Sequence, residues 1–395
     1  MTRFLIALLL FSQANTQVEQ AWKLAANGQR DQAISLLQQF LTAAPTDADA
    51  RLLLGSLFME AGRHDEAVEQ LSEAVKLLPR SADAENALGE AYTSFGDYKN
   101  AQGPFEKAVA LKPDFAVAQL NLGEALLNLG SRDASAQHLD RAIKLLGHGE
   151  DLANAHYLRA KLYTDAGDIA KAAAHLQQAV AMRPAFHQAW SDLGEARKTL
   201  QDDASALVAF QHAVELAPAD AVAQYRLGVE YLDLNKPHDA VAHLETAYRL
   251  TPEDQSTLNA LQRALRQDGR TTDADAIREK LSDLLRRRDE ANQNALKGTS
   301  LNNEGAKLEQ AGNLKDALEK YQVAARLAPE SVPIRVNYAV ALLRSGKWTE
   351  GLNELHAAAL MDPSNSKIKQ TLQQALAQAP VETLPDWAQK GRGQK

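Results

Sequence analysis

Three histidines, His138, His175 and His243, are the first candidates for chemistry, because they recur at one position of a repeated pattern. Histidine nitrogens are common zinc ligands and lie about 2 Å from the metal. The three residues belong to separate predicted helices, and the axes of packed helices are roughly 8 to 10 Å apart. Descent of the repeats from one ancestor explains the recurrence better than a shared metal does, so we predict no metal site.

No other residue pattern indicates catalysis or a cofactor. The chain has 0 Cys, which excludes thiolate nucleophiles, disulfides and Cys-ligated zinc or iron–sulfur clusters. It also lacks a glycine-rich phosphate loop after a strand, an H-E-x-x-H motif and a G-x-S-x-G motif. Gly147-His148-Gly149 is interpreted as a loop insertion, and Asp202-Asp203 as a solvated turn. We therefore predict that the protein is not an enzyme and needs no cofactor.

The charge balance narrows the class of partner. The 395 residues include 43 Lys plus Arg and 51 Asp plus Glu, a net charge of −8 that is spread along the chain. Such a chain offers no basic field for phosphates, so nucleic acid and anionic membrane surfaces are unfavourable partners.

The first residues resemble a signal peptide. Arg3 precedes an apolar run from Phe4 to Phe11, and Ser12-Gln13-Ala14 places small residues where a signal peptidase cuts. The run is too short for a membrane span, which needs roughly 20 residues. We expect residues 1–14 to be a signal peptide and the protein to be exported to the periplasm or the cell exterior. The alternative is an apolar helix that caps the fold.

The prolines reveal an internal repeat of 34 residues. Eight of the 13 prolines share one phase, interrupted by an insertion near Gly147 and another near Arg286: Pro45, Pro79, Pro113, Pro184, Pro218, Pro252, Pro329 and Pro363. Each proline ends a predicted helix, because proline cannot continue one. We number these residues as position 32 of each repeat.

Other positions of the repeat have equally regular residue types. Position 8 is often glycine, which indicates close helix contact: Gly55, Gly89, Gly123, Gly194, Gly228 and Gly305. Position 15 is mostly glycine and follows an apolar-periodic run, as in Gly96, which indicates a turn between two helices. Positions 20 and 27 are mostly alanine, as in Ala101 and Ala108, and position 24 is large and apolar, as in Phe105. Each repeat is therefore predicted to be two antiparallel helices with interlocking faces.

These residues resemble the tetratricopeptide repeat, whose signature is W-x-x-L-G-x-x-Y followed by A, F, A and P. The agreement is fullest in two repeats, through Trp190, Leu193, Gly194, Ala206, Phe210, Ala213 and Pro218, and through Leu88, Gly89, Tyr92, Ala101, Phe105, Ala108 and Pro113. The resemblance implies an all-α, right-handed α-solenoid of about ten helix-turn-helix repeats. It extends over nearly all of the chain after residue 14.

Departures from the signature divide the predicted array. The eighth repeat has Gln262, Arg278 and Arg286 at positions 8, 24 and 32, and no helix breaker precedes Gly298. We predict eight repeats over residues 15–286, a connecting helix extension over 287–297 and two repeats over 298–363. A polar capping helix over 364–379 and a disordered tail over 380–395 complete the chain.

The family resemblance also indicates which residues line the concave groove. Tetratricopeptide proteins commonly bind a peptide there, between the first helices of their repeats. The matching positions of this chain are Asn86, Glu90, Asn121, Glu124, Tyr157, Lys161, Asp192, Glu195, Tyr225 and Arg226. Four carboxylates against two cations favour a basic or polar ligand. The alternative for each residue is an ordinary solvated helix face.

We therefore expect a non-catalytic scaffold that binds an extended segment of another protein. Two alternatives remain open at the level of sequence. One is a structural spacer in an envelope export or secretion assembly, and the other is a substrate-recruiting subunit of an enzyme on another chain. The identity of the partner and the oligomeric state do not follow from the sequence.

Overall fold

The computed structural model describes residues 16–390, and within this range the chain is helical with no β-strand. The predicted signal peptide, residues 1–14, lies outside the described residues. The contacts divide the chain into an N-terminal unit that ends at Gly269 and a C-terminal unit that begins at Arg270. No helix among residues 16–390 combines the length and the apolar character needed to cross a membrane.

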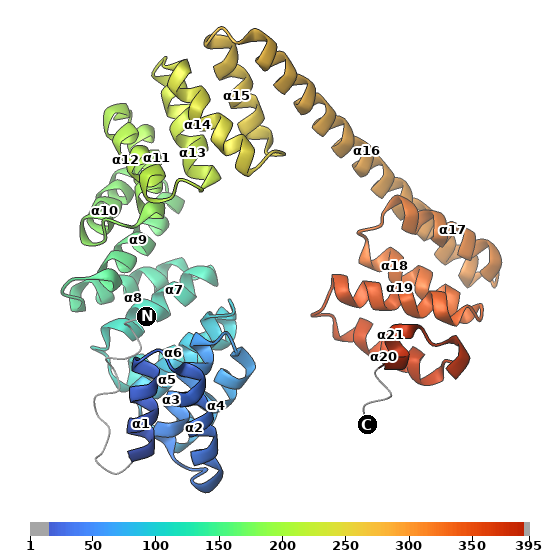
Figure 1. Cartoon of the computed structure of the whole chain (residues 1–395), viewed down its shortest axis with the longest axis horizontal. Helices are drawn as coiled ribbons and strands as arrows, with labels where there is room; N and C mark the ends of the chain where they lie inside the picture. Colours follow the sequence, from blue (N-terminus) through green and yellow to red (C-terminus); the bar gives the residue numbers. More distant parts are fainter. Residues whose placement is uncertain (1–15, 391–395) are drawn as a thin grey trace. The chain divides into compact units, whose positions relative to one another are not determined.

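The N-terminal unit is a series of antiparallel helix pairs, and each pair packs against the next (Figure 1). Its helices are α1 (Thr16–Ala26), α2 (Arg30–Ala43), α3 (Ala48–Glu60), α4 (His64–Leu77), α5 (Ala82–Thr93), α6 (Tyr98–Leu111), α7 (Ala116–Asn128), α8 (Arg132–Leu145), α9 (Glu150–Asp165), α10 (Ile169–Met182), α11 (His187–Thr199), α12 (Asp203–Leu216), α13 (Ala221–Asp233), α14 (Pro237–Leu250) and α15 (Gln255–Gln267). The predicted all-α solenoid is confirmed.

The C-terminal unit begins with a long helix and continues with further antiparallel helices. Its elements are α16 (Thr271–Gln310), α17 (Leu314–Leu327), α18 (Val332–Arg344), α19 (Trp348–Met361), α20 (Ser366–Gln378), a 3₁₀ helix (Val381–Thr383) and α21 (Asp386–Lys390). Helix α20 lies where the sequence predicts the capping helix.

Helix α16 differs from the sequence-based expectation. The sequence predicts a helix that ends before Gly298, whereas α16 continues for 40 residues to Gln310 and includes the first helix of the ninth repeat. Gly298 is buried, and a Cβ built on it would lie 3.0 Å from Ala328 Cβ. This glycine permits close packing inside the helix and does not end it. In contrast, every residue from 285 to 297 is exposed.

The predicted disordered tail also differs from the structure. Residues 381–383 form the 3₁₀ helix and residues 386–390 form α21. The indole of Trp387 stacks on His356 with ring centroids 4.1 Å apart, and its Nε1 donates a hydrogen bond to Asn353 Oδ1 at 2.8 Å. These contacts with α19 order a segment whose prolines suggested disorder. Residues 391–395 lie outside the described range.

The glycines at position 8 provide room for the large residue at position 24 of the same repeat. A Cβ built on Gly89 would lie 2.4 Å from Phe105 Cε1, and one built on Gly55 would lie 2.5 Å from Leu71 Cγ. Both large side chains are fully buried. The expected close helix contact is therefore a contact between the two helices of one repeat.

The turn between the two helices of a repeat requires a positive φ at position 15. Gly96 has φ 75°, and seven other repeats have glycine there with similar angles. The sixth and seventh repeats have Gln201 and Asn235 at this position, with φ of 62° and 56°. The turn is thus conserved in shape even where its usual residue is missing.

The residue at position 4 of a repeat, which is Trp in the family signature, forms a hydrogen bond with the preceding repeat. The carbonyl oxygen of the proline at position 32 accepts a bond from the position-4 side chain of the next repeat in five places, at 2.8 to 3.0 Å. The donors are Arg51, Gln119, Trp190, Gln224 and Arg335. Each of these prolines lies two residues beyond the end of a helix, so the bond connects the turn after that helix to the next repeat.

The residue at position 4 is also the contact of each of the three recurring histidines. His138 Nδ1 is 2.7 Å from Gln119 Oε1, and His243 Nδ1 is 2.8 Å from Gln224 Oε1. In the fifth repeat the position-4 residue is His156, whose Nδ1 is 2.9 Å from His175 Nδ1. Each histidine pairs within its own repeat, and no group of three His, Cys, Asp or Glu among residues 16–390 could hold a metal ion.

The histidine pair makes the stability of the N-terminal unit depend on pH. Burial, together with the nearby charge of His175, lowers the pKa of His156 to about 4. The unfolded chain, with a histidine pKa near 6.5, therefore binds a proton more readily than the folded chain does. The contribution of His156 to folding stability is fully present above about pH 6.5. It is lost progressively as the pH falls toward 4.

Replacing His156 with glutamine should remove part of this acid sensitivity, because Gln119 and Gln224 already pair with histidines elsewhere. Between pH 8 and pH 5 the wild type should lose about 1 kcal/mol more free energy of unfolding than His156→Gln. Urea unfolding followed by circular dichroism at both pH values measures the difference. Equal losses for the two proteins would contradict the prediction.

Candidate functional site

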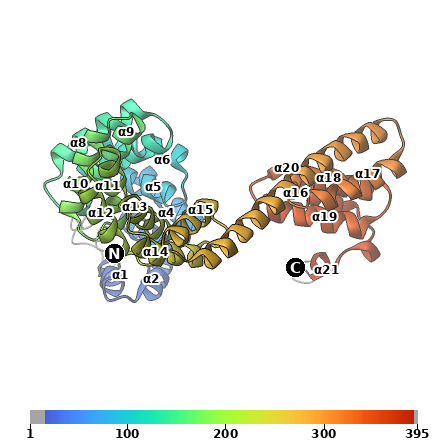
Figure 2. The ribbon, with the colours of Figure 1, turned by 90° about the horizontal axis from the view of Figure 1, so that it is seen from above.

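The first helices of successive repeats contact one another. The second helices of successive repeats contact one another less. Among the described residues, α3 contacts α5, α5 contacts α7, α7 contacts α9, and α13 contacts α15. Seen from above, α8 and α10 lie at the periphery of the N-terminal unit, and α11 and α13 lie inward of them (Figure 2). The ten predicted groove residues all belong to these first helices.

One group of predicted groove residues forms a hydrogen-bonded cluster between α5 and α7. Asn121 Nδ2 donates to Asn86 Oδ1 at 3.1 Å and to Glu90 Oε1 at 2.9 Å. Asn86 Nδ2 also donates to Glu90 Oε1, at 3.1 Å. Asn86 is only 6% exposed, so its amide is a fixed part of the helix interface and not a freely accessible contact.

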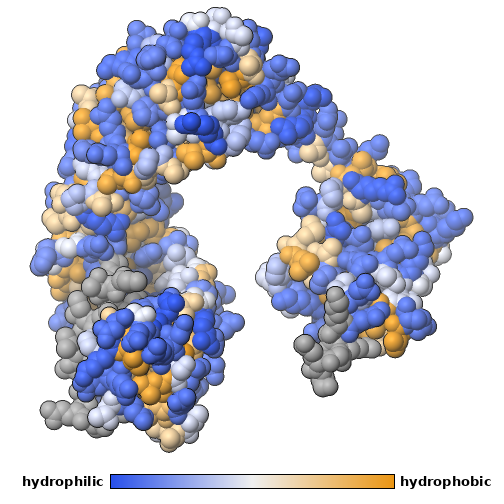
Figure 3. All heavy atoms as spheres, viewed as in Figure 1, coloured by the Kyte–Doolittle hydropathy of each residue, from blue (hydrophilic) through white to orange (hydrophobic). Residues whose placement is uncertain are grey.

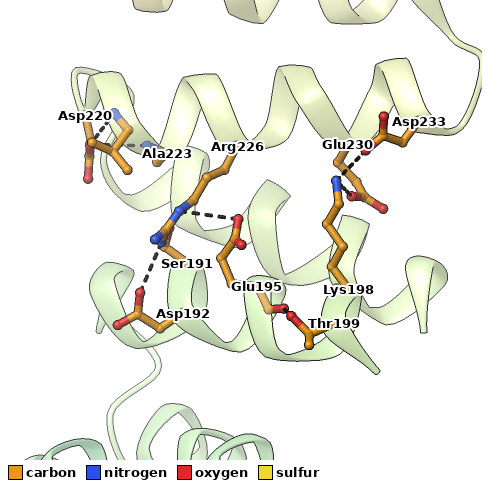
Figure 4. A network of polar contacts seen from close by, with 11 residues as sticks. Ser191, Asp192, Glu195, Lys198, Thr199, Asp220, Ala223, Arg226, Glu230 and Asp233 are labelled. Atoms are coloured by element: carbon orange, nitrogen blue, oxygen red, sulfur yellow. Dashed lines mark hydrogen bonds and ion pairs between the residues drawn. The ribbon is translucent and has the colours of Figure 1, made fainter. Parts of the chain in front are cut away.

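A second group joins α9, α11 and α13. Arg226 Nη1 donates to Ser191 Oγ at 2.7 Å and to Asp192 Oδ1 at 3.0 Å, and its Nε is 3.5 Å from Glu195 Oε1 (Figure 4). The hydroxyl of Tyr157 donates to Asp192 Oδ2 at 3.1 Å. Burial and the charge of Asp192 raise the pKa of Tyr157 above its usual range. This tyrosine therefore acts as a neutral donor.

A further ionic cluster lies beside the second group and was not predicted from the sequence. Lys198 Nζ is 2.8 Å from Glu230 Oε2 and 2.7 Å from Asp233 Oδ2 (Figure 4). Arg263 Nη2 lies 3.2 Å from Asp233 Oδ1. Burial tends to lower the pKa of Lys198, but the hydrogen bond to Asp233 and the ion pair with Glu230 raise it above its ordinary value. Glu230 is fully buried, at 0% exposure.

The remaining predicted groove residues stand apart from these clusters. The Lys161 ammonium lies 6.0 Å from the ring centroid of Tyr157, and its side chain is exposed. Tyr225 is half-buried, beside Arg226 in the chain. Glu124 lines a pocket with Glu90 and Asn121. The structure thus unites seven of the ten residues in two clusters and leaves Lys161, Tyr225 and Glu124 outside them.

A constant spacing connects the pairs that join one first helix to the next. Position 5 of one repeat is bonded to position 6 of the following repeat, 35 residues later, in four places: Asn86–Asn121, Tyr157–Asp192, Ser191–Arg226 and Asn302–Asn337. This interval is one residue longer than the repeat. A search for complementary polar residues at this spacing could have found Ser191 and the pairing itself.

The surface seen in Figure 3 is mainly hydrophilic on both units, with hydrophobic residues in small separate areas.

Three protein-family models, each described as tetratricopeptide repeat, match this chain. One matches residues 145–383, another matches 18–82 and 55–114, and the third matches 92–162. A TPR repeat-containing protein of Pseudomonas aeruginosa is 38% identical over 74 residues, which cover 19% of this chain and 70% of that protein.

Two solved structures are similar to parts of this chain. The structure of PilF from Pseudomonas aeruginosa aligns with a TM-score of 0.50 at 17% identity, and covers 54% of this chain and 95% of that one. The structure of PilW, described as a widely conserved type IV pilus biogenesis factor, aligns with a TM-score of 0.49 at 19% identity. That alignment covers 54% of this chain and 98% of PilW. At such low identity, the likeness concerns the fold alone.

Proposed function

Because the chain belongs to the tetratricopeptide repeat family, we propose that it is a non-catalytic scaffold that binds an extended segment of another protein along the first helices of the N-terminal unit. Stacked helix pairs of this kind present extended surfaces that serve to bind protein partners. The segment would lie against Asn121, Tyr157 and Tyr225 and their neighbours on the same face.

The observation that carries this proposal is that polar side chains on the face of the first helices are held in place by hydrogen bonds. Bonds between repeats hold Asn121, Tyr157 and Arg226 in fixed positions before any partner arrives. A preorganised surface loses less conformational entropy on binding, which favours affinity. Amides and tyrosines also suit an extended backbone, since they hydrogen-bond and offer flat contact area.

We include export in the proposal. The basic residue, apolar run and small residues of 1–14 support it, so the partner would be a protein of the cell envelope or the exterior.

Capture of partners tests the proposal. The immobilised protein should retain a saturable protein from envelope extract, identified by mass spectrometry. A variant with Asn121→Ala, Tyr157→Ala and Tyr225→Ala should retain at least about tenfold less of it, because aromatic anchors dominate binding energy. Circular dichroism checks that the variant is folded.

A matched control changes the second helices only. Gln177→Ala, Val208→Ala and Glu215→Ala replace three exposed residues of α10 and α12, and this variant should retain the partner fully. Identical partner lists for wild type and groove variant would contradict groove binding and favour the spacer function. An empty list for the wild type would contradict export.

A further inference from the structure

A pocket of about 570 Å³ lies between the second helices of the third and fourth repeats, and we call it the α6–α8 pocket. None of the ten predicted groove residues lines it. Its lining includes Val109 from α6, Pro113 from the turn after α6, and His138, Asp140, Arg141 and Lys144 from α8.

Two cations of the α6–α8 pocket have no carboxylate of the described chain to balance them. Arg141 Nε donates a hydrogen bond to the carbonyl oxygen of Pro113 at 3.1 Å. The Nη groups of Arg141 and the ammonium of Lys144 form no hydrogen bond or ion pair with any of residues 16–390. Asp140 is not their counter-ion, because Arg159 of α9 binds both of its carboxylate oxygens, at 2.7 and 3.3 Å. A ligand that complements this lining must therefore supply negative charge.

Glu106 of α6 also contributes charge near the α6–α8 pocket, because it acts on the pKa of His138. Its Oε1 accepts a hydrogen bond from Gln102 at 2.7 Å, and within the described range it forms no ion pair with Arg141 or Lys144. It lowers the positive potential beside α6 and leaves both cations of α8 unpaired. The negative group of a ligand is therefore expected on the α8 side of the pocket.

The apolar part of the lining restricts the ligand further. Val109 and Pro113 give the other wall a patch that suits methylene groups. A glutamate side chain combines two methylene groups with a carboxylate, and a guanidinium can bind a carboxylate through two parallel hydrogen bonds. An inorganic anion would leave the patch of Val109 and Pro113 without a contact.

The seventh repeat has the same framework with different charges. The residues that correspond in the two places are Val109 and Val214, Pro113 and Pro218, Gln119 and Gln224, and His138 and His243. Where the α6–α8 pocket has Arg141 and Lys144, the seventh repeat has Thr246 and Arg249, and Arg249 Nη2 donates to Thr246 Oγ1 at 2.9 Å. The framework therefore does not require the two unpaired cations of the fourth repeat.

We propose that the α6–α8 pocket binds a glutamate side chain of a partner protein. The Nη groups of Arg141 and the ammonium of Lys144 donate hydrogen bonds to the carboxylate, and Val109 and Pro113 contact the methylene groups. Because the pocket is lined by second helices and by none of the groove residues, it is a second attachment point. It does not depend on the proposed function of the groove.

Histidine NMR tests this inference with a defined probe. The full chain is labelled with ¹³C at the histidine Cε1 atoms, and His138→Gln and His243→Gln assign two of the 10 His resonances. Burial lowers the pKa of both histidines, so both rings are neutral at pH 7.5. The probe is the peptide acetyl-Ala-Ser-Glu-Ser-Ala-amide, whose only charge is the glutamate. The His138 resonance should shift saturably, and that of His243 should stay in place.

Two comparisons establish the chemistry of recognition. The same peptide with glutamine in place of glutamate should bind at least about tenfold more weakly, because the charge-assisted hydrogen bonds are lost. The double variant Arg141→Thr and Lys144→Gln should weaken binding of the glutamate peptide by a similar factor, and Thr246 shows that threonine fits the first of these positions. Lys76→Gln is the matched control, because Lys76 has the same repeat position as Lys144 but is paired with Glu73. It should leave the affinity unchanged.

Equal affinity for the glutamate and glutamine peptides would overturn the inference, and so would an unmoved His138 resonance. An equal shift of His138 with inorganic phosphate at the same concentration would show a site for any small anion and reject the glutamate side chain. Circular dichroism checks the fold of the double variant. Lys144→Gln alone changes an exposed side chain and should weaken binding about threefold, so the test holds even if the double variant unfolds.

Discussion

Replacing Lys198 with alanine should lower the free energy of unfolding of the N-terminal unit by about 3 kcal/mol. Its ammonium is the cation 2.8 Å from Glu230, whose carboxylate is fully buried. Removing one partner of a buried ion pair leaves an uncompensated charge, which costs several kcal/mol. The charge of Asp233 would still be balanced, because Arg263 lies 3.2 Å from it. Urea unfolding followed by circular dichroism at neutral pH measures the loss.

Glu230→Ala is the companion variant that gives this prediction its specificity. Alanine already occupies the equivalent position in the third, fourth and sixth repeats, as Ala91, Ala125 and Ala196, and is buried in each. This variant should therefore cost about 1 kcal/mol or less, and the double variant should resemble it and not Lys198→Ala. Similar losses for Lys198→Ala and Glu230→Ala would show that the buried carboxylate does not depend on its lysine.

Replacing Gly89 with alanine should lower the free energy of unfolding by about 2 kcal/mol. The new Cβ would lie 2.4 Å from Phe105 Cε1 and 2.6 Å from Cδ1, and Phe105 is fully buried. Overpacking of a core typically costs about 1 to 3 kcal/mol, and the steric conflict here exceeds the gain of up to about 1 kcal/mol in helix propensity. Thermal and urea unfolding both report the change.

Two further variants test the cause. Gly147→Ala adds the same methyl group at a loop glycine with nothing within 4 Å and no positive φ, and should be neutral or slightly stabilising. Adding Phe105→Leu to Gly89→Ala should recover part of the loss, because the fifth repeat places Ala160 and Leu176 at these two positions, both buried. Strictly additive losses would indicate that the ring is not the obstacle.

The repeat itself was predictable because its constraints are local and recur. A proline ends a helix wherever it occurs, and the small and large residues at positions 8 and 24 must fit each other within one repeat. Eight prolines in phase therefore indicated the helix pairs. The same locality explains why the ten predicted groove residues could be assigned to the first helices of their repeats.

The contacts between repeats were harder to predict, because each depends on two residues that no single repeat contains. Asn121 was identified as a groove residue, but its bonds to Asn86 and Glu90 depend on a spacing one residue longer than the repeat. The burial of Glu230 could not be predicted either, because it depends on Lys198 of the preceding repeat. Gly298 resembled a helix stop because sequence alone does not distinguish a turn glycine from a packing glycine.

The exposed stretch of α16 has a consequence for cooperativity. Residues 285–297 bury no side chain, so no buried interface with a neighbouring helix holds this segment in place. In a linear array, unfolding spreads from one repeat to the next through the buried interface between them. A segment without such an interface interrupts that spread. The repeats before it and the repeats after it should therefore behave as separate folding units, each with its own transition.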